Sequence, residues 1–115
     1  MESTFDKSTY LKKHCKELQY LCKAKPSIQK AIVEKANKSL IYCICECVQN
    51  ILKGHVRLTT NQRKRLRRHK TNLRKLLEKK TSLVGKKRIV QKGGFLGALA
   101  PILLPLATQV LSKLF

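Results

Sequence analysis

The sequence predicts an all-α protein: a small three-helix domain, followed by a basic linker and an apolar C-terminal helical segment. Apolar residues recur at helical spacing from Ile28 to Leu52, which is the strongest periodic signal in the chain. Pro26 and Gly54 supply helix-stop signals on either side of that stretch. Thr59 and Gln62 then match a capping box that opens another helix. With 115 residues, the chain is long enough for one small domain.

The first two helices are predicted from their apolar spacing. In residues 8–24, apolar residues recur at intervals of three, four and seven. They are Leu11, Cys15, Leu18, Leu21 and Cys22. We expect Ser27 to cap a second, longer helix that runs to about Lys53. Between Leu40 and Val48 apolar side chains cover much of the helix, so we expect this part to be buried on more than one side.

The third predicted helix runs from the capping box to about Lys80 and is strongly basic. A narrow apolar stripe runs along it, formed by Leu66, Leu73, Leu76 and Leu77. Like charges repel along a helix, so we expect this one to be stable only when docked by its leucines or bound to an anion. His69 is expected to face phosphate together with the basic side chains.

The rest of the chain divides at a glycine pair. Residues 1–80 are expected to form the helical domain, residues 81–94 a basic linker that ends in Gly93-Gly94, and residues 95–115 the apolar segment. Within the linker, residues 81–92 are expected to form a loop or short strand. The apolar segment is near the minimum length for spanning a bilayer, but Pro101 and Pro105 interrupt its helical bonding. We therefore expect an interfacial segment, or one that packs on the helical domain.

Charge is concentrated in the middle of the chain. The net charge is +20, and residues 53–92 contribute +15 of it with sixteen Lys or Arg and one acid. A local field of one sign binds polyanions, nucleic acid first and anionic lipid second. The candidate phosphate-binding residues are Arg57, Arg63, Lys64, Arg65, Arg67, Arg68, Lys70, Arg74, Lys75, Lys86, Lys87 and Arg88.

The chemistry-bearing residues favour a protein that is not an enzyme and holds no metal or cofactor. Cys43, Cys45 and Cys47 alternate, and helical neighbours two apart point about 200° apart, so the three thiols do not converge. We expect the cysteines to be small core residues, although the pair His14-Cys15 could in principle complete a metal site with them. The acids are dispersed, and no triad or glycine-rich phosphate loop is present. An odd cysteine count without a signal-peptide pattern favours reduced thiols.

Residues 86–105 read KKRIVQKGGFLGALAPILLP. This stretch resembles the precursor of the small basic adenovirus core protein known as mu, or protein X, and its relatives in adintoviruses and Polinton (Maverick) elements. In that family a basic, DNA-condensing segment leads into Gly-Gly and an apolar, proline-containing end. The resemblance covers about thirty residues, from Lys86 to the C-terminus, and residues 8–80 have no counterpart in it.

The resemblance implies a minor core protein that binds double-stranded DNA without sequence preference, in the virion and the host nucleus. It also implies a viral maturation protease that cuts after Gly94, while a simple hinge at Gly93-Gly94 is the alternative. A membrane-active or membrane-anchored basic protein is a second interpretation, in which the apolar segment inserts and basic residues hold anionic headgroups. RNA binding is a third, although the chain has few aromatic residues for stacking on bases. The sequence leaves a homo-oligomer open.

Overall fold

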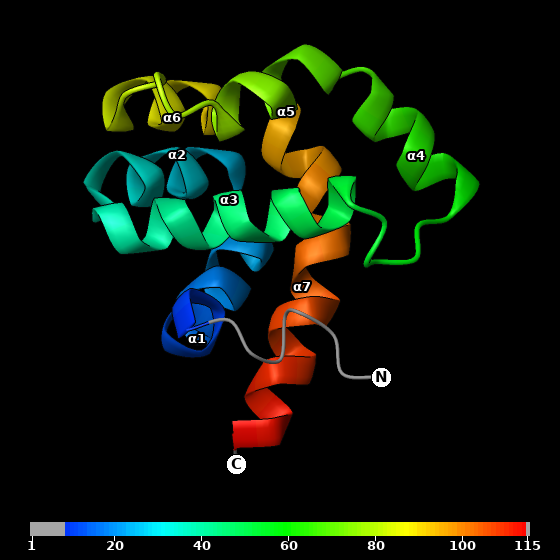
Figure 1. The fold of residues 1–115 in the computed structure, drawn as a ribbon. Helices are drawn as coiled ribbons and strands as arrows, with labels where there is room; N and C mark the ends of the chain where they lie inside the picture. Colours follow the sequence, from blue (N-terminus) through cyan, green and yellow to red (C-terminus); the bar gives the residue numbers. More distant parts are fainter. Residues whose placement is uncertain (1–8, 115) are drawn as a thin grey trace.

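The computed structural model describes residues 9–114, and every regular element in that range is a helix (Figure 1). The helices are α1 (Thr9–Lys23), α2 (Pro26–Lys35), α3 (Lys38–Leu52), α4 (Thr60–Arg67), α5 (Lys70–Leu77), α6 (Leu83–Val90) and α7 (Phe95–Leu114). The all-α prediction is therefore confirmed, and the predicted C-terminal apolar helix is present.

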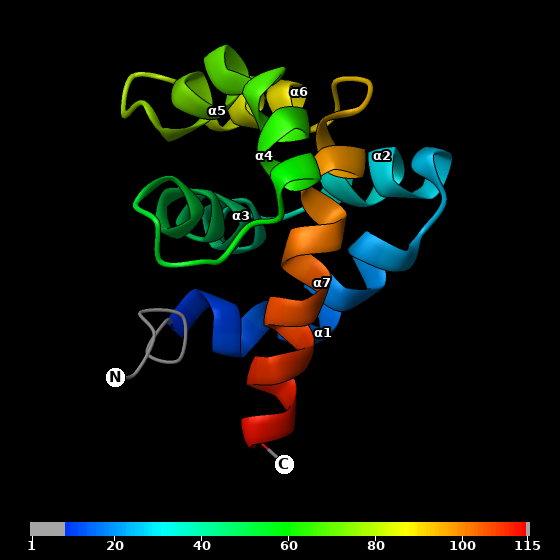
Figure 2. The same cartoon turned by 90° about the vertical axis from the view of Figure 1, so that its right-hand side faces the viewer.

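The helices stack around α3, and α7 ties the stack together. In Figures 1 and 2, α3 lies between α1 below and α5 with α6 above. The helix α7 runs through the height of the molecule, packs most extensively along α1, and also contacts α4 and α6. The result is a nearly isometric body of 33 × 30 × 28 Å.

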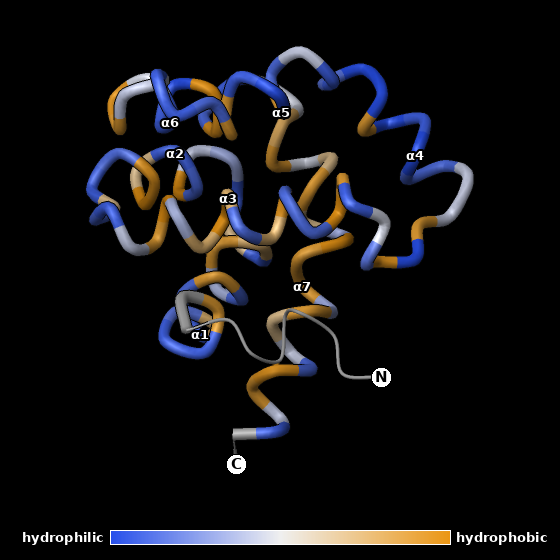
Figure 3. Tube along the Cα trace, viewed as in Figure 1, coloured by the Kyte–Doolittle hydropathy of each residue, from blue (hydrophilic) through white to orange (hydrophobic). Residues whose placement is uncertain are grey.

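One hydrophobic core joins residues from α1 to α7. The predicted burial of the central stretch is confirmed, since Leu40, Ile41, Cys43, Ile44, Cys47 and Val48 are all buried. Of the expected leucine stripe, Leu66, Leu73 and Leu76 are buried and Leu77 is half-buried. Figure 3 shows the contrast that follows: α7 is mostly hydrophobic along its length, whereas α4 is mostly hydrophilic.

The single long helix expected over residues 27–53 is wrong, because the chain breaks at Ala36 and Asn37. Ala36 is extended (φ −64°, ψ 142°), and the Asn37 side chain accepts a hydrogen bond of 2.9 Å from the Leu40 N–H. An Asn that caps a new helix in this way competes with continuation of the old one. The start was also misplaced, since Lys25 is the N-cap residue and Pro26 occupies the first helical turn, where its missing N–H costs nothing.

Two further expectations about the basic region are wrong. The third predicted helix is divided into α4 and α5, which meet at Arg68 and His69. Residues 81–92 are not a loop or strand, because they contain α6, whose first turn is capped by the Ser82 hydroxyl accepting from the Gly85 N–H at 3.1 Å. That short cap was the overlooked signal.

Packing in α7 depends on where its prolines lie. Pro101 and Pro105 are exposed, whereas Leu99, Ile102 and Leu103 on the opposite side are buried. Each proline leaves the carbonyl four residues earlier without its helical donor, and on the exposed side water can take the donor's place. By length and composition, Phe95–Lys113 is apolar enough to cross a membrane, and half of that window is buried inside the fold.

Candidate nucleic-acid interface

The basic side chains of α4 and α5 form one exposed surface, here called the basic ridge. It consists of Arg63, Lys64, Arg65, Arg67, Arg68, Lys70, Arg74 and Lys75, every one of which is exposed. In residues 53–92 the sole acid is Glu78, which follows the ridge and lies 3.8 Å from the Lys80 ammonium. An exposed ion pair of this kind neutralises little of the field. The ridge therefore presents nearly uncompensated positive charge.

Buried leucines hold the ridge on the body of the protein. Leu66 anchors α4, which packs on α7, and Leu73 and Leu76 anchor α5, which packs on α3 and α6. The predicted capping box is formed: the Thr59 hydroxyl accepts from the Gln62 N–H at 3.1 Å, and the Thr59 N–H donates to the Gln62 side chain at 2.9 Å. Docking on three helices offsets the self-repulsion of these short helices.

His69 forms the corner between the two basic helices. Its ring packs edge-on against Phe95, with centroids 5.8 Å apart and planes at 83°. His69 is half-buried and Phe95 is fully buried. The expectation that His69 faces phosphate therefore missed its packing role at the corner between α4 and α5.

A shallow recess of about 260 Å³ lies beside this corner, where the ridge meets the start of α7. It is lined by Arg65, Arg68, His69, Gly94, Gly97 and Ala98. Gly94 has φ +81°, a conformation that favours glycine. A Cβ atom added at this position would lie 3.7 Å from the His69 ring. Two guanidinium groups next to the positive end of a long helix make this the part of the ridge most favourable for a phosphate oxygen.

Lys86 is turned inward, whereas the sequence prediction places it among the exposed phosphate-binding residues. It is buried (7% exposed), and its ammonium donates to the carbonyl of Leu76 and, at 3.1 Å, to that of Glu78. These carbonyls stand at the end of α5, where no helical N–H remains to pair with them. The charge of Lys86 thus serves the helix terminus.

The two basic residues that follow Lys86 differ from each other in exposure. The Lys87 ammonium donates to the Glu34 carbonyl on α2 at 3.1 Å, and only Arg88 of the three is exposed. Arg57 is exposed in the loop that leads into α4. The structure therefore brings the α4 and α5 residues together and disperses the cluster at 86–88.

Sequence analysis also missed members of the surface. Lys79 and Lys80 are exposed just beyond α5 and extend the ridge past Glu78. The signal was present in the sequence, since both lysines belong to the same basic run. Lys92 is exposed as well, and its ammonium donates to the Asn72 side chain at 3.1 Å.

The cysteines contribute to packing, and the thiols of Cys22 and Cys47 are held in the neutral form. All five are free thiols, and Cys15, Cys43 and Cys47 are buried. Burial raises the pKa of Cys22 to about 11, with a smaller contribution from nearby Cys43. The hydrogen bond with Cys43, together with burial, raises the pKa of Cys47 far above its ordinary range. Because the thiolate is the form that attacks electrophiles and ligates metals, these thiols are poorly suited to either role near neutral pH.

His14, the other candidate metal ligand, is also part of the core. It is buried, and its Nδ1 atom lies 2.9 Å from the Glu17 carboxylate. Within residues 9–114, no group of three or more His, Cys, Asp or Glu residues is arranged to hold a metal ion.

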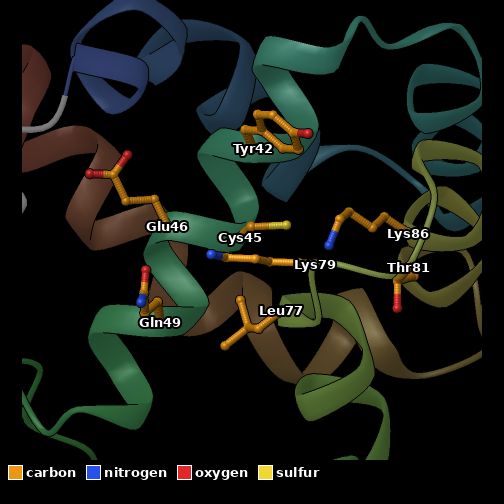
Figure 4. A pocket seen from close by; sticks show the side chains of 8 residues that line it. All are labelled: Tyr42, Cys45, Glu46, Gln49, Leu77, Lys79, Thr81 and Lys86. Carbon is orange, nitrogen blue, oxygen red and sulfur yellow. The ribbon is translucent and has the colours of Figure 1, made fainter.

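A pocket lies between α3 and the segment that joins α5 to α6 (Figure 4). It has a volume of about 590 Å³ and is lined by Tyr42, Cys45, Glu46, Gln49, Leu77, Lys79, Thr81 and Lys86. Burial raises the pKa of Cys45 to about 11 despite the opposing effect of Lys86. The Lys86 ammonium is itself engaged by carbonyls. Near neutral pH the Cys45 thiol is therefore protonated, and the Lys86 ammonium is already hydrogen-bonded.

Comparison of the chain with protein-family models, with curated proteins and with solved structures finds no match in any of the three.

Proposed function

We propose that this protein is a non-enzymatic DNA-binding protein that neutralises and condenses double-stranded DNA without reading its sequence. The observation that carries the proposal is the basic ridge: eight exposed cations on two docked helices, with buried leucines beneath them. Lys and Arg on a rigid support contact phosphates, which are the same in every sequence. Each phosphate neutralised releases counterions, so binding should be tight at low salt and weak at high salt.

Duplex DNA fits the ridge better than a single strand does. Proteins that hold single strands stack successive bases on exposed aromatic rings. Residues 60–77 contain no Phe, Tyr or Trp, and the one imidazole among them, His69, packs against Phe95. The ridge offers cations without a stacking platform, which is suited to a stacked helix whose phosphates face outward. The same point argues against single-stranded RNA.

The test compares a ridge variant with a charge-matched control. The ridge variant carries Arg63→Gln, Arg65→Gln, Arg67→Gln and Arg68→Gln. The control variant carries Lys25→Gln, Lys30→Gln, Lys35→Gln and Lys38→Gln, which remove four exposed charges from α2 and the start of α3. Affinity is measured across a salt series for two unrelated duplexes and for a single strand with the same number of phosphates.

The wild type should bind both duplexes alike and the single strand more weakly. The ridge variant should weaken binding to both duplexes equally and flatten the salt slope by about 1 for each arginine that contacts phosphate. The control variant should retain most of the wild-type affinity and slope. A flat salt response in the wild type, a strong preference for one duplex, or equal losses in the two variants would contradict the proposal.

We also propose the biological setting that the C-terminal resemblance implies: a core protein of an adenovirus-like virion or of a Polinton element, acting with DNA in the virion and host nucleus. Gly93 and Gly94, the suspected protease site, are exposed between α6 and α7. Purified protein incubated with an adenovirus-type maturation protease should be cut after Gly94. An intact chain after prolonged incubation would remove this part of the proposal.

Membrane binding is the alternative function, and the length and apolarity of α7 favour it. Insertion requires α7 to leave α1, and it also places the carbonyls orphaned by Pro101 and Pro105 in hydrocarbon, which is costly. Anionic liposomes washed at high salt distinguish the two. Protein held only by headgroup attraction should wash off, whereas protein that remains has inserted and favours the membrane interpretation.

A further inference from the structure

A groove opens between α1, α2 and the start of α3, on helices that carry no part of the basic ridge. Its volume is about 550 Å³, and its lining is mainly apolar. Ile32 and Ala36 in this lining are half-buried, and Leu40 is buried. Tyr20 from α1 and Ile28 from α2 line it as well, and they are 61% and 42% exposed. The groove therefore offers apolar contacts that the fold itself does not cover.

Exposed large hydrophobic side chains are few in residues 9–114, and this groove gathers two of them. The four are Tyr20, Ile28, Leu52 and Val84. Leu52 at the end of α3 and Val84 on α6 do not line the groove. One exposed hydrophobic residue is ordinary, whereas several that share a concave surface with a polar rim are typical of a binding site. The basic ridge has no such surface, because the leucines of α4 and α5 are buried or half-buried.

The helices around the groove carry an excess of positive charge. Residues 9–38 contain eight lysines and two acids, a net charge of +6. Lys35 lines the groove and is exposed. Glu17 also lines it, and the Glu17 carboxylate lies 2.9 Å from the Nδ1 atom of buried His14. The second acid, Glu34, lies about 120° around α2 from Ile28. The excess remains after both acids are counted, whichever lysines pair with them.

Apolarity, shape and charge together select the occupant of the groove. An amphipathic helix laid in a groove buries its apolar face and leaves its polar face along the rim. Glutamate or aspartate on that polar face is attracted by the net charge of +6 around this groove. Duplex DNA has no comparable apolar face to bury. A second copy of this chain brings a net charge of +20 and is repelled.

We infer that this groove binds an acidic amphipathic helix of another protein. The inference goes beyond the proposed function and does not depend on it, since the groove and the basic ridge are built from different helices. It gives the chain a protein partner in addition to DNA.

Three labelled peptides test the inference by fluorescence anisotropy at physiological salt. The acidic peptide, about 18 residues long so that a helix can form, has leucine along one face and glutamate along the other. The scrambled peptide has the same composition in an order that destroys the apolar face. The basic peptide has lysine in place of glutamate. The comparison separates the contribution of the apolar face from that of charge.

Two pairs of variants locate the binding site. The groove variant carries Tyr20→Ser and Ile28→Ser, and its control carries Leu52→Ser and Val84→Ser, which remove the two exposed hydrophobic side chains outside the groove. The two charge-matched variants described above form the second pair: the ridge variant, and the lysine variant that lacks Lys25, Lys30, Lys35 and Lys38. Circular dichroism and thermal unfolding establish that each variant is folded.

The wild type should bind the acidic peptide about tenfold or more tightly than the scrambled or basic peptide. The groove variant should lose about tenfold or more in affinity for the acidic peptide, since a few apolar anchors carry most of the energy of such an interface. The control at Leu52 and Val84 should bind as the wild type does. The lysine variant should lose more affinity than the ridge variant, because Lys35 lines the groove.

Equal affinity of the wild type for the acidic and scrambled peptides would overturn the inference, and so would wild-type affinity in the groove variant. A larger loss in the ridge variant than in the lysine variant would mean that the peptide binds the ridge as a polyanion. Equally tight binding of the basic peptide would remove the charge argument. Sedimentation should find a monomer without peptide, and a dimer that the groove variant abolishes would show that the groove holds a second copy. Failure of the wild type to bind duplex DNA is different, because it contradicts only the proposed function.

Discussion

At the scale of single residues, lysine side chains of this protein occur in two different environments, buried and exposed. Lys86 and Lys75 are separated by eleven positions, and both belong to the set predicted from sequence to contact phosphate. Lys75 is exposed on α5, whereas the Lys86 ammonium caps the last carbonyls of the same helix from inside. Sequence alone does not separate them, because the difference depends on how α6 folds back onto α5.

Replacing each lysine should therefore have a different consequence. Lys86→Met should lower stability by about 1–3 kcal/mol, since the Leu76 carbonyl loses its ammonium donor and keeps only the weak Cys45 thiol at 3.9 Å, and should leave DNA affinity unchanged. Lys75→Gln should weaken DNA binding with little effect on stability. Thermal unfolding and duplex titration of both variants measure the two effects. A loss of DNA affinity in Lys86→Met that matches Lys75→Gln would show that Lys86 does contact phosphate.

The neutral thiols make the stability of the folded chain depend on pH, and their raised pKa values fix the sign of that dependence. The pKa values of Cys22 and Cys45 rise from 9.0 to about 11 in the folded chain, mainly through burial. Above pH 9 the unfolded chain loses these thiol protons while the folded chain retains them, so stability falls between pH 9 and about 11. Below pH 9 the contribution is fully present.

Urea unfolding across that pH window tests the prediction. In a Cys22→Ala, Cys45→Ala double variant the decline in stability with pH should be shallower than in the wild type, because two groups with shifted pKa values are gone. The matched comparison is Cys15→Ala, which removes another thiol from α1. An unchanged slope in the double variant would show that burial does not hold these thiols neutral.

At the scale of helices, the features predicted correctly from the sequence are those marked by apolar periodicity or by a strong cap. The capping box of α4 and the stop at Gly54, where φ is +80°, are as expected. The breaks at Asn37 and His69 were missed for a physical reason: the apolar period continues across both, because the core on either side is the same. A cap or a corner contact decides such breaks, and the contact between His69 and Phe95 depends on residues 26 positions apart.

The helix α7 provides a test of packing. Leu103 is completely buried on the side of α7 away from its prolines, so Leu103→Ala should cost about 2–5 kcal/mol through lost contacts and a cavity. Leu104→Ala, one position along and only half-buried, is the matched control and should cost less. Denaturant unfolding measures both. Equal small effects would mean that α7 is not part of the cooperative core.

Packing of α7 also bears on the glycine pair. Phe95 and Leu96 are buried immediately after Gly94, so cutting the chain there should not release the helix. A site for a specific protease inserted between Gly93 and Gly94, both exposed, allows the cut to be made at will. The nicked protein should elute as one species in gel filtration and separate only in denaturant. Separate elution of the helical body and α7 under native conditions would contradict this prediction.

At the scale of the whole molecule, the proposed function depends on the charge distribution. The sequence located most of the net charge of +20 in residues 53–92 and most of the ridge within it. It did not show which basic residues share a surface, because that depends on the corner at His69 and the inward turn of Lys86. The structure places most of the predicted phosphate-binding residues on one exposed surface, while DNA binding by that surface remains the proposal.

The most direct test of that proposal is a lysine acetylation footprint, read by mass spectrometry with and without one equivalent of duplex DNA. Lys64, Lys70 and Lys75 should lose reactivity when DNA is added, because phosphate covers them. Lys86 should react slowly in both states because it is buried. Lys30 and Lys35, exposed on α2, should react equally in both. Protection of the α2 lysines without protection on α4 and α5 would contradict the assignment of the DNA-binding surface to the basic ridge.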